Sequence, residues 1–112
     1  MSKRAHIELL SDIQEAIRRI AEYTASVTYE EFLRNTQVQD AVVRNLEIIG
    51  EAVKKLDRDF KNKHQEIDWK KIAGLRDKVI HDYFGVNWDI VWDVVQHKAP
   101  ELQALLERLL RT

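Results

Sequence analysis

The stretch IDWKKIAGLRDKVIHDYFGVN, residues 67–87, contains the signals for one helix and for both of its ends. Asp68 is a favourable N-cap residue, so we expect a helix to begin at Trp69. Gly85 is the expected C-terminal stop, and Asn87 is the expected cap of the helix that follows. Between these ends, apolar side chains recur at helical spacing, which predicts one buried face.

The residues before this stretch show the same periodicity. Apolar side chains recur every three or four positions over residues 4–25 and over residues 36–61, which predicts two long amphipathic helices. Between these segments, Thr28 followed by Glu31 is the pattern of a capping box. A short helix is therefore expected over residues 29–35.

The C-terminal part is expected to be helical from Trp88 to about Arg111. Pro100 has no amide hydrogen and restricts the residue before it, so a kink or a short break is expected over residues 97–100. Pro100 should lie in the first turn of a final helix. No segment has the alternation of a strand. The predicted architecture is all-α, an antiparallel bundle of about four to five helices in a single domain over residues 1–112.

Composition excludes several classes of protein. The chain has 112 residues, of which 45% are hydrophobic and 33% are charged, enough for one hydrophobic core. The absence of cysteine excludes a disulfide framework and a thiolate zinc site. No apolar run approaches the roughly 18 residues of a membrane span, and charges interrupt the N-terminus where a signal peptide needs an apolar stretch. We therefore expect a cytoplasmic protein without a membrane partner.

Charge is distributed unevenly along the chain. The formal net charge is −1, so nothing in the overall balance indicates nucleic acid. From Lys54 to Lys78, however, nine basic residues stand against five acidic ones, an excess of four. A solvated charged surface is the simpler interpretation of this excess, and a face for a polyanion is the alternative.

Arg76 has an unusual place on the helix expected after Asp68. At about 100° per residue, it falls in the middle of the apolar face, with Asp77 and His81 along its margin. Asp77 and His81 are four positions apart and can touch. Tyr83 returns to the apolar side if the helix continues that far.

Two structural explanations of Arg76 compete with a functional one. The guanidinium is expensive to bury alone, so it could be tied to Glu47 or Glu51 of the preceding helix, or could extend to water along its apolar stem. His81 could cap the helix end, where its charged form is favoured. The functional alternative is a reaction site in a groove.

RNA cleavage requires the residue types that Arg76 and His81 supply. A base must remove the proton of the 2′-hydroxyl, and a cation must stabilise the charge that grows on the phosphorane. The imidazole titrates in the right range, and the guanidinium forks onto phosphate oxygens. This chemistry needs no metal or cofactor. The candidates for binding the RNA lie on the outer face of the same helix: Lys70, Lys71 and Lys78.

Other conspicuous residues have structural interpretations. The histidines outside the helix share no metal-ligand spacing, so we expect no metal site: His6, His64 and His97. The tryptophans could stack on bases, but their helical spacing favours the core: Trp69, Trp88 and Trp92. Gly50 inside a helix lowers helix stability by about 1 kcal/mol relative to Ala, and a close helix contact is the expected reason.

The run RDKVIHDY, residues 76–83, combines Arg, four residues, His, one residue and Tyr. It resembles the signature of the HepT-like HEPN ribonuclease toxins, the partners of minimal nucleotidyltransferase (MNT) antitoxins. The runs NLEIIGEAVKKL before it and VNWDIVWDVVQHKAPELQALL after it resemble the same family in the same order. The resemblance covers about residues 4–110.

The resemblance implies an all-α HEPN fold and a homodimer whose two motifs line a shared cleft. It also implies metal-independent RNA cleavage, with Arg76 and His81 as catalytic residues and Asp77 as a polar helper. A cognate nucleotidyltransferase would silence the toxin by adding AMP to Tyr83. The alternative is a non-catalytic HEPN helical module that only binds such a nucleotidyltransferase.

Overall fold

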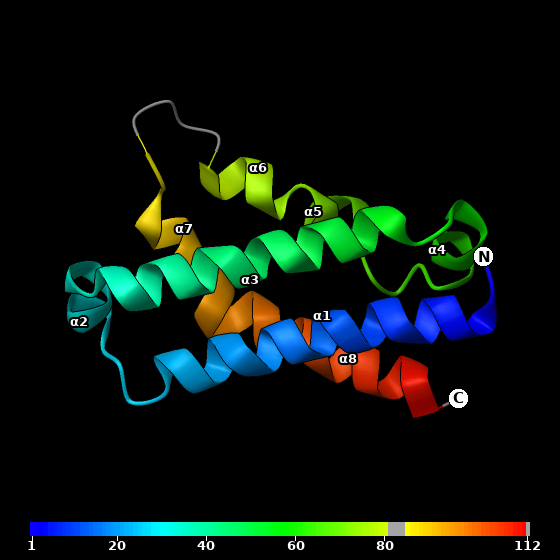
Figure 1. Cartoon of the computed structure of the whole chain (residues 1–112), viewed down its shortest axis with the longest axis horizontal. Coiled ribbons are helices and arrows are strands. Elements are labelled where there is room, and N and C mark those ends of the chain that lie inside the picture. The colour runs from blue at the N-terminus through cyan, green and yellow to red at the C-terminus, as the bar shows by residue number, and fades with distance from the viewer. Residues whose placement is uncertain (81–84, 112) are drawn as a thin grey trace.

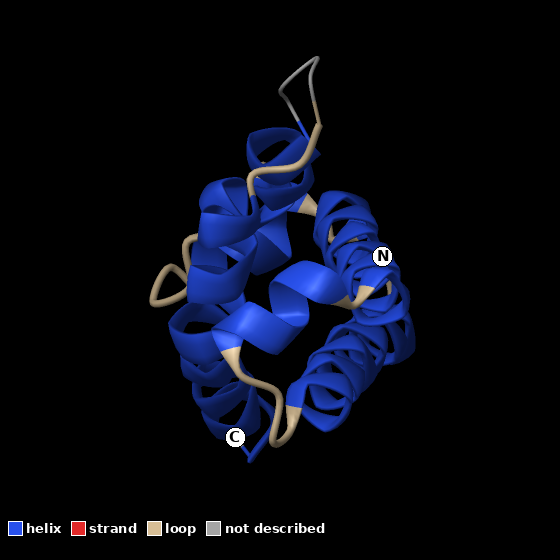
Figure 2. Ribbon diagram, turned by 90° about the vertical axis from the view of Figure 1, so that its left-hand side faces the viewer, coloured by secondary structure: helices blue, strands red, loops and turns tan. Residues whose placement is uncertain are grey.

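The computed structural model describes residues 1–80 and 85–111, with residues 76, 79 and 80 described by their backbone alone. All regular elements in this part of the chain are helices (Figures 1 and 2), so the all-α prediction is confirmed. In chain order they are α1 (Lys3–Thr24), α2 (Tyr29–Arg34), α3 (Thr36–Lys55), α4 (Arg58–Lys63), α5 (Trp69–Ala73), α6 (Leu75–Ile80), α7 (Trp88–Asp93), the π-helix η1 (Val94–Lys98) and α8 (Ala99–Arg111).

The two long helices α1 and α3 lie antiparallel and side by side, and α8 packs against α1 (Figure 1). Their apolar stripes meet in one core, and each fully buried side chain of this size contributes about 1.5–3 kcal/mol. The largest fully buried side chains are Leu10, Ile13 and Ile20 of α1, Phe32 of α2, Val42, Leu46, Ile49 and Val53 of α3, Val91 of α7 and Leu106 of α8.

The N-terminal helices have the predicted ends to within one residue. The capping box of α2 is complete, with the Glu31 amide donating to the Thr28 hydroxyl over 3.1 Å. α2 then stops at Arg34, because the side chain of Asn35 accepts from the Val38 amide at 3.1 Å and caps α3. The chain thus reverses direction within a few residues, which places α1 and α3 antiparallel.

The prediction of one helix over residues 36–61 was wrong. α3 ends at Lys55, where the extended backbone of Leu56 turns the chain, and α4 begins at Arg58. Asp57 is the cause, since its carboxylate accepts the Phe60 amide at 2.8 Å and caps a new helix. Leu56 is buried and Phe60 is packed against the core. Both predicted apolar positions therefore contact the core, although the helix is interrupted between them.

A continuous helix after Asp68 was also predicted, and this was wrong at Gly74. Asp68 caps α5 and Trp69 begins it, as expected. Gly74 then has φ −84° and ψ −2°, which ends α5, and α6 follows from Leu75. A rotation of about 100° per residue therefore does not extend unbroken from Trp69 to α6. The expected helix end before Gly85 falls on residues 81–84, outside the described part of the chain.

The C-terminal segment follows its prediction closely. Asn87 caps α7 through the Ile90 amide at 3.2 Å. A kink or break was expected over residues 97–100; the structure instead has the π-helix η1 over Val94–Lys98, in which the Ala99 amide donates to the carbonyl of Val94. Pro100 lies in the first turn of α8, as predicted. A missing amide hydrogen is tolerated at this point, because the widened turn already leaves the regular α-helical pattern.

The tryptophans are structural, as expected. Trp88 and Trp92 pack on the buried ring of Phe32, with centroid distances of 5.7 and 5.0 Å. Trp69 is 6% exposed and packs near Phe60. None of the helices in the described ranges is both long and apolar enough to cross a membrane.

Candidate active site

The predicted motif falls on α6 and on the residues directly after it. α6 contacts α3, α5 and α7, and Leu75 at its start packs against the core. Asp77 and Lys78 are both exposed on α6. The projection predicted this for Lys78, whereas it placed Asp77 at the margin of the apolar face. The side chain of Arg76 and the whole of His81 and Tyr83 lie outside the described residues. Their proposed roles, and a pairing of Arg76 with an acid of α3, therefore stay predictions.

The segment before α6 is fixed by polar and apolar contacts together. The Asp68 carboxylate accepts the Lys71 amide at 3.1 Å. The Trp69 ring is buried, and its indole N–H donates to the carbonyl of His64 over 3.0 Å. A buried indole N–H without a partner would be unfavourable, so this bond satisfies the ring while it anchors the start of α5.

Gly50 brings α3 close to the end of α5, and this expectation is confirmed. A Cβ atom placed on Gly50 would lie 3.5 Å from the carbonyl oxygen of Ala73. That separation is an ordinary van der Waals contact, so a methyl group fits here without movement of α5. The position of α5, and with it the start of α6, is therefore set by a small residue on α3.

A second set of contacts joins the N-terminus to α4. The His6 ring stacks on Phe60 at 4.4 Å between centroids, and its Nε2 lies 3.2 Å from the Asp57 carboxylate. The Phe60 amide, and after it His6, hold the pKa of Asp57 below its usual range, while partial burial opposes this. Phe60 also packs against His64, which links α1 to the segment that leads into α5.

The three lysines proposed to bind RNA lie on different surfaces. Lys70 lines an open hollow of about 880 Å³ between α4 and α5. Lys71 lines a second cleft, on the side of α5 that faces α8. Lys78 is exposed on α6. Lys70 and Lys71 therefore face different hollows, and the roles of all three lysines in RNA binding stay predictions.

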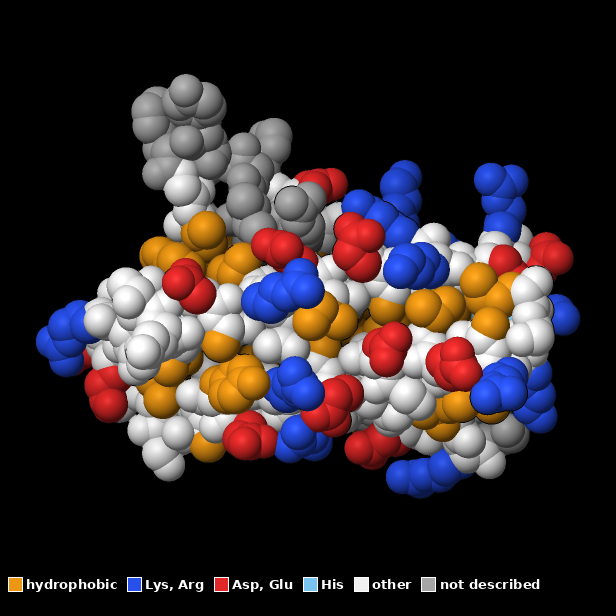
Figure 3. Space-filling model, viewed as in Figure 1, with side chains coloured by type: hydrophobic (Ala, Val, Ile, Leu, Met, Phe, Trp, Pro, Cys, Tyr) orange, Lys and Arg blue, Asp and Glu red, His pale blue; other side chains and the backbone are white. Residues whose placement is uncertain are grey.

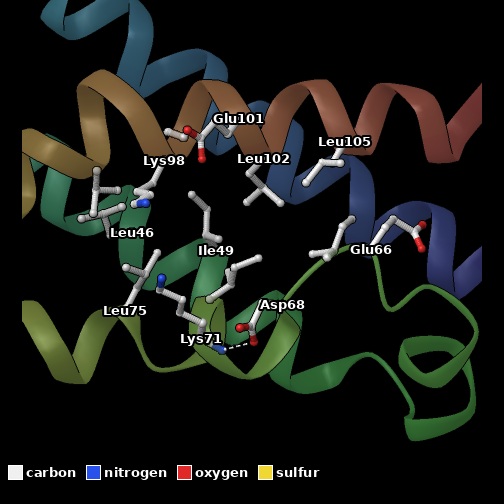
Figure 4. Close-up of a pocket in the computed structure, with 14 residues that line it drawn as sticks. Leu46, Ile49, Glu66, Asp68, Lys71, Leu75, Lys98, Glu101, Leu102 and Leu105 are labelled. Carbon is white, nitrogen blue, oxygen red and sulfur yellow. Dashed lines mark hydrogen bonds between the residues drawn. The ribbon is translucent and has the colours of Figure 1, made fainter.

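The second cleft has a volume of about 260 Å³ and lies beside α6 (Figure 4). Ile49 of α3, Leu75 of α6 and Leu102 of α8 face the same space. Lys71, Lys98 and Glu101 stand around its edge. The floor is apolar and the edge is charged, which is the usual composition of a surface that receives another apolar group.

Among residues 1–80 and 85–111, the structure has no group of three His, Cys, Asp or Glu side chains that could hold a metal ion. Two histidines of this part of the chain, His6 and His64, are used in contacts near α4, whereas His97 is exposed on η1. His6 and His64 both stack on Phe60, as described above.

The family model for ribonuclease HepT-like proteins matches residues 13–109. The chain belongs to this family. The match includes α6 and the motif residues that follow it, as the resemblance of the run RDKVIHDY predicted. It also includes the helices α3, α5 and α8, which surround the cleft beside α6.

Curated relatives of this HepT-like chain carry provisional assignments as RNases. A protein of Methanocaldococcus jannaschii provisionally assigned as an RNase is 44% identical over 111 residues, which are 99% of this chain and 92% of the relative. A protein of Thermococcus cleftensis provisionally assigned as ribonuclease HepT is 47% identical over 107 residues, 96% of this chain and 97% of the relative.

The fold of this HepT-like chain is also that of a solved structure. The Shewanella oneidensis HEPN toxin, solved as a tri-AMPylated protein in complex with an MNT antitoxin, aligns with a TM-score of 0.73. The sequences are 24% identical, and the alignment covers 100% of both chains. The predicted HEPN fold is therefore confirmed.

Sequence reasoning missed Asp57 and the surface around α4. The spacing of Leu56 and Phe60 fits a continuous helix, so it did not indicate that a new helix starts between them. The signal was present, because an Asp three residues before Phe60 is an N-cap pattern with a second acid, Asp59, in the first turn. Reading that signal would have placed Arg58 and Lys61 on a separate short helix.

Proposed function

We propose that this protein is a metal-independent endoribonuclease, the toxin of a pair whose antitoxin is a nucleotidyltransferase. The observation that carries the proposal is the family match over residues 13–109, which spans the Arg76, His81 and Tyr83 motif. Relatives assigned as RNases match nearly the whole length of the chain, which supports the same activity here.

In the proposed reaction, a 2′-hydroxyl of the RNA attacks the adjacent phosphodiester of the same strand. His81 removes the proton from a 2′-hydroxyl, and the oxygen attacks the adjacent phosphorus. The P–O5′ bond breaks, the 5′-oxygen leaves and takes the proton that His81 had accepted, and the other product carries a 2′,3′-cyclic phosphate. Arg76 stabilises the charge on the phosphorane, and Asp77, four positions before His81, orients the imidazole.

A homodimer is part of the proposal. Ile72, Leu75 and Leu105 are half-buried in the apolar cleft beside α6, and a second chain placed there would cover them. Such a partner would bring a second motif close to the first. Light scattering should give about twice the 13.2 kDa chain mass at micromolar concentration, and a monomer would remove the shared cleft from the mechanism.

Control by AMP transfer to Tyr83 is the third part. The S. oneidensis HEPN toxin was solved in tri-AMPylated form with an MNT antitoxin, which supports the same modification here. An AMP group on Tyr83 would put a phosphodiester anion where RNA phosphate must bind, and Arg76 would pair with it. With the partner enzyme and ATP, intact mass should rise by one or more AMP groups for the wild type and by none for Tyr83→Phe. Equal gains would place the modification elsewhere.

Incubation of the purified protein with total RNA in EDTA tests the activity itself. The wild type should cleave RNA, and His81→Ala should lose about 10²–10⁴-fold, the usual contribution of a positioned acid or base. Equal rates for both proteins would indicate a contaminating nuclease. If neither protein cleaves and both bind the nucleotidyltransferase, the chain is the non-catalytic helical module instead.

A further inference from the structure

We propose that the hollow between α4 and α5 binds the sugar–phosphate backbone of single-stranded RNA next to the bond that is cut. This inference rests on the proposed function and adds to it a binding surface outside the motif. The hollow is lined by Arg58, Lys61, Asn62, Gln65, Ile67, Asp68, Trp69, Lys70 and Ala73, and has a volume of about 880 Å³. Pockets that hold whole ligands have roughly 300–1,000 Å³, so it has room for a stretch of polymer.

The lining carries uncompensated positive charge. Arg58 and Lys61 come from α4 and Lys70 comes from α5, and none of these forms an ion pair with another described residue. Asp68 is the one acid in the lining, and it already accepts the Lys71 amide. The hollow therefore presents three cations against one engaged carboxylate.

The remaining lining residues suit a nucleic acid better than a single anion. Asn62 and Gln65 are exposed amides, which can donate and accept hydrogen bonds with ribose hydroxyls and base edges. Ile67 and Trp69 are buried and add an apolar part to the lining of the hollow. A groove with cations along it and uncharged hydrogen-bonding groups between them can bind along a nucleic-acid backbone.

The hollow leads directly to α6. Ala73, at its inner end, is the last residue of α5, and α6 begins two residues later at Leu75. Figure 3 shows Lys and Arg side chains standing along the edge of the molecule over α5 and α4. RNA that crosses this edge would continue onto α6, where Lys78 is exposed and Arg76 follows the helix start.

This arrangement assigns a positioning role to residues that lie outside the motif. Arg58, Lys61 and Lys70 would hold flanking phosphates, so that binding energy away from the scissile bond fixes the RNA for attack. They would not act on the reacting atoms. The dependence on these residues should therefore appear in binding and in KM for long RNA, and not in the chemical step.

The test compares two charge-matched triple variants in the His81→Ala background. The groove variant is Arg58→Gln, Lys61→Gln and Lys70→Gln. The control is Lys3→Gln, Arg108→Gln and Arg111→Gln, which removes three exposed cations from outside the hollow. Fluorescence anisotropy with a labelled single-stranded oligoribonucleotide gives Kd at several salt concentrations, and circular dichroism and thermal melting confirm that each variant is folded.

The groove variant should raise Kd by about tenfold or more and lower the salt slope by about 2, since each lost phosphate contact on a single strand contributes about 0.7. The control variant should bind as the parent does. Equal binding by both triple variants would overturn the proposal. Normal RNA binding by the groove variant with loss of nucleotidyltransferase binding would also overturn it and would assign the hollow to an acidic protein partner.

A second readout separates this proposal from the proposed function. With His81 restored, the groove variant should cleave a long RNA with raised KM and a kcat within about twofold of the wild type. Its cleavage of a dinucleotide, which has no phosphate other than the one that is cut, should be unchanged. Lack of cleavage by the wild type would refute the ribonuclease assignment, whereas a fall in kcat on both substrates would refute the positioning role alone.

Discussion

Replacing Gly50 tests whether α3 sets the position of the helix that carries the motif. In Gly50→Ala, the new methyl group lies 3.5 Å from the carbonyl oxygen of Ala73, an ordinary contact that requires no movement. Alanine is also about 1 kcal/mol more favourable than glycine inside a helix. The variant should therefore unfold at a temperature about 4–8 °C above the wild type.

Gly50→Val is the matched variant. Its branched methyl groups extend beyond the Cβ position, and the nearest atom is backbone oxygen of α5, which cannot move alone. Overpacking of this kind lowers stability by about 1–3 kcal/mol, so the valine variant should melt below the alanine variant by several degrees. Thermal melting gives the order, and an RNA cleavage assay should show loss only for valine, since α5 and α6 shift together. If the two variants have the same melting temperature, the space around Gly50 is open and α3 does not determine the position of α5.

Three further predictions concern the segment from α4 to α5. The pKa of Asp57 is lowered in the folded state, so its carboxylate stabilises the protein above its ordinary pKa of 3.8 and loses this effect as pH falls through the lower folded value. Urea unfolding of the wild type and Asp57→Asn should therefore differ at pH 6 and converge in acid; a constant difference would refute this. Asp68→Ala removes the α5 cap and should lower the free energy of unfolding by about 1 kcal/mol, and Asp68→Asn, which keeps a capping oxygen, should lose less. Trp69→Phe removes the indole N–H that donates to the carbonyl of His64. It should lower the free energy of unfolding by about 1–2 kcal/mol. Equal free energies of unfolding for this variant and the wild type would show that water replaces the lost donor.

The sequence predicted helix starts well where the capping residue was recognised. Thr28, Asn87 and Asp68 are caps whose side chains accept amide hydrogens within a few residues, so local chemistry decides where those helices begin. Pro100 acts locally as well, through its missing amide hydrogen. For these elements, tertiary packing adds stability without changing the residue at which each helix is predicted to begin.

The two errors, at Asp57 and Gly74, have a common physical origin. In both places the apolar spacing continues across a break, because the segments on both sides face the same core. Periodicity reports which face is buried and does not report whether the backbone between two buried residues stays helical. The hollow between α4 and α5 depends on the break at Asp57, so its lining residues were not grouped by sequence reasoning.

Within the candidate site, the exposure of Lys78 was predictable from helical spacing, whereas Asp77 was placed at the margin of the apolar face and is exposed. The sequence prediction grouped Lys70 and Lys71 on one outer face, although neighbouring residues on a helix point in directions about 100° apart. Which surface each lysine meets depends on α4 and α8, which pack there from distant parts of the sequence.

The central claim is that side chains of this protein promote attack by the 2′-hydroxyl without a metal. The most direct measurement is the chemistry of the cut ends, made in EDTA on an oligoribonucleotide and on a deoxyribonucleotide of the same sequence. The RNA should be cut by the wild type and not detectably by His81→Ala, and the products should end in a 2′,3′-cyclic phosphate or the 3′-phosphate formed from it. The DNA should remain intact. Products with 3′-hydroxyl and 5′-phosphate ends, cleavage of the DNA, or activity that appears only when Mg²⁺ is added would contradict the claim.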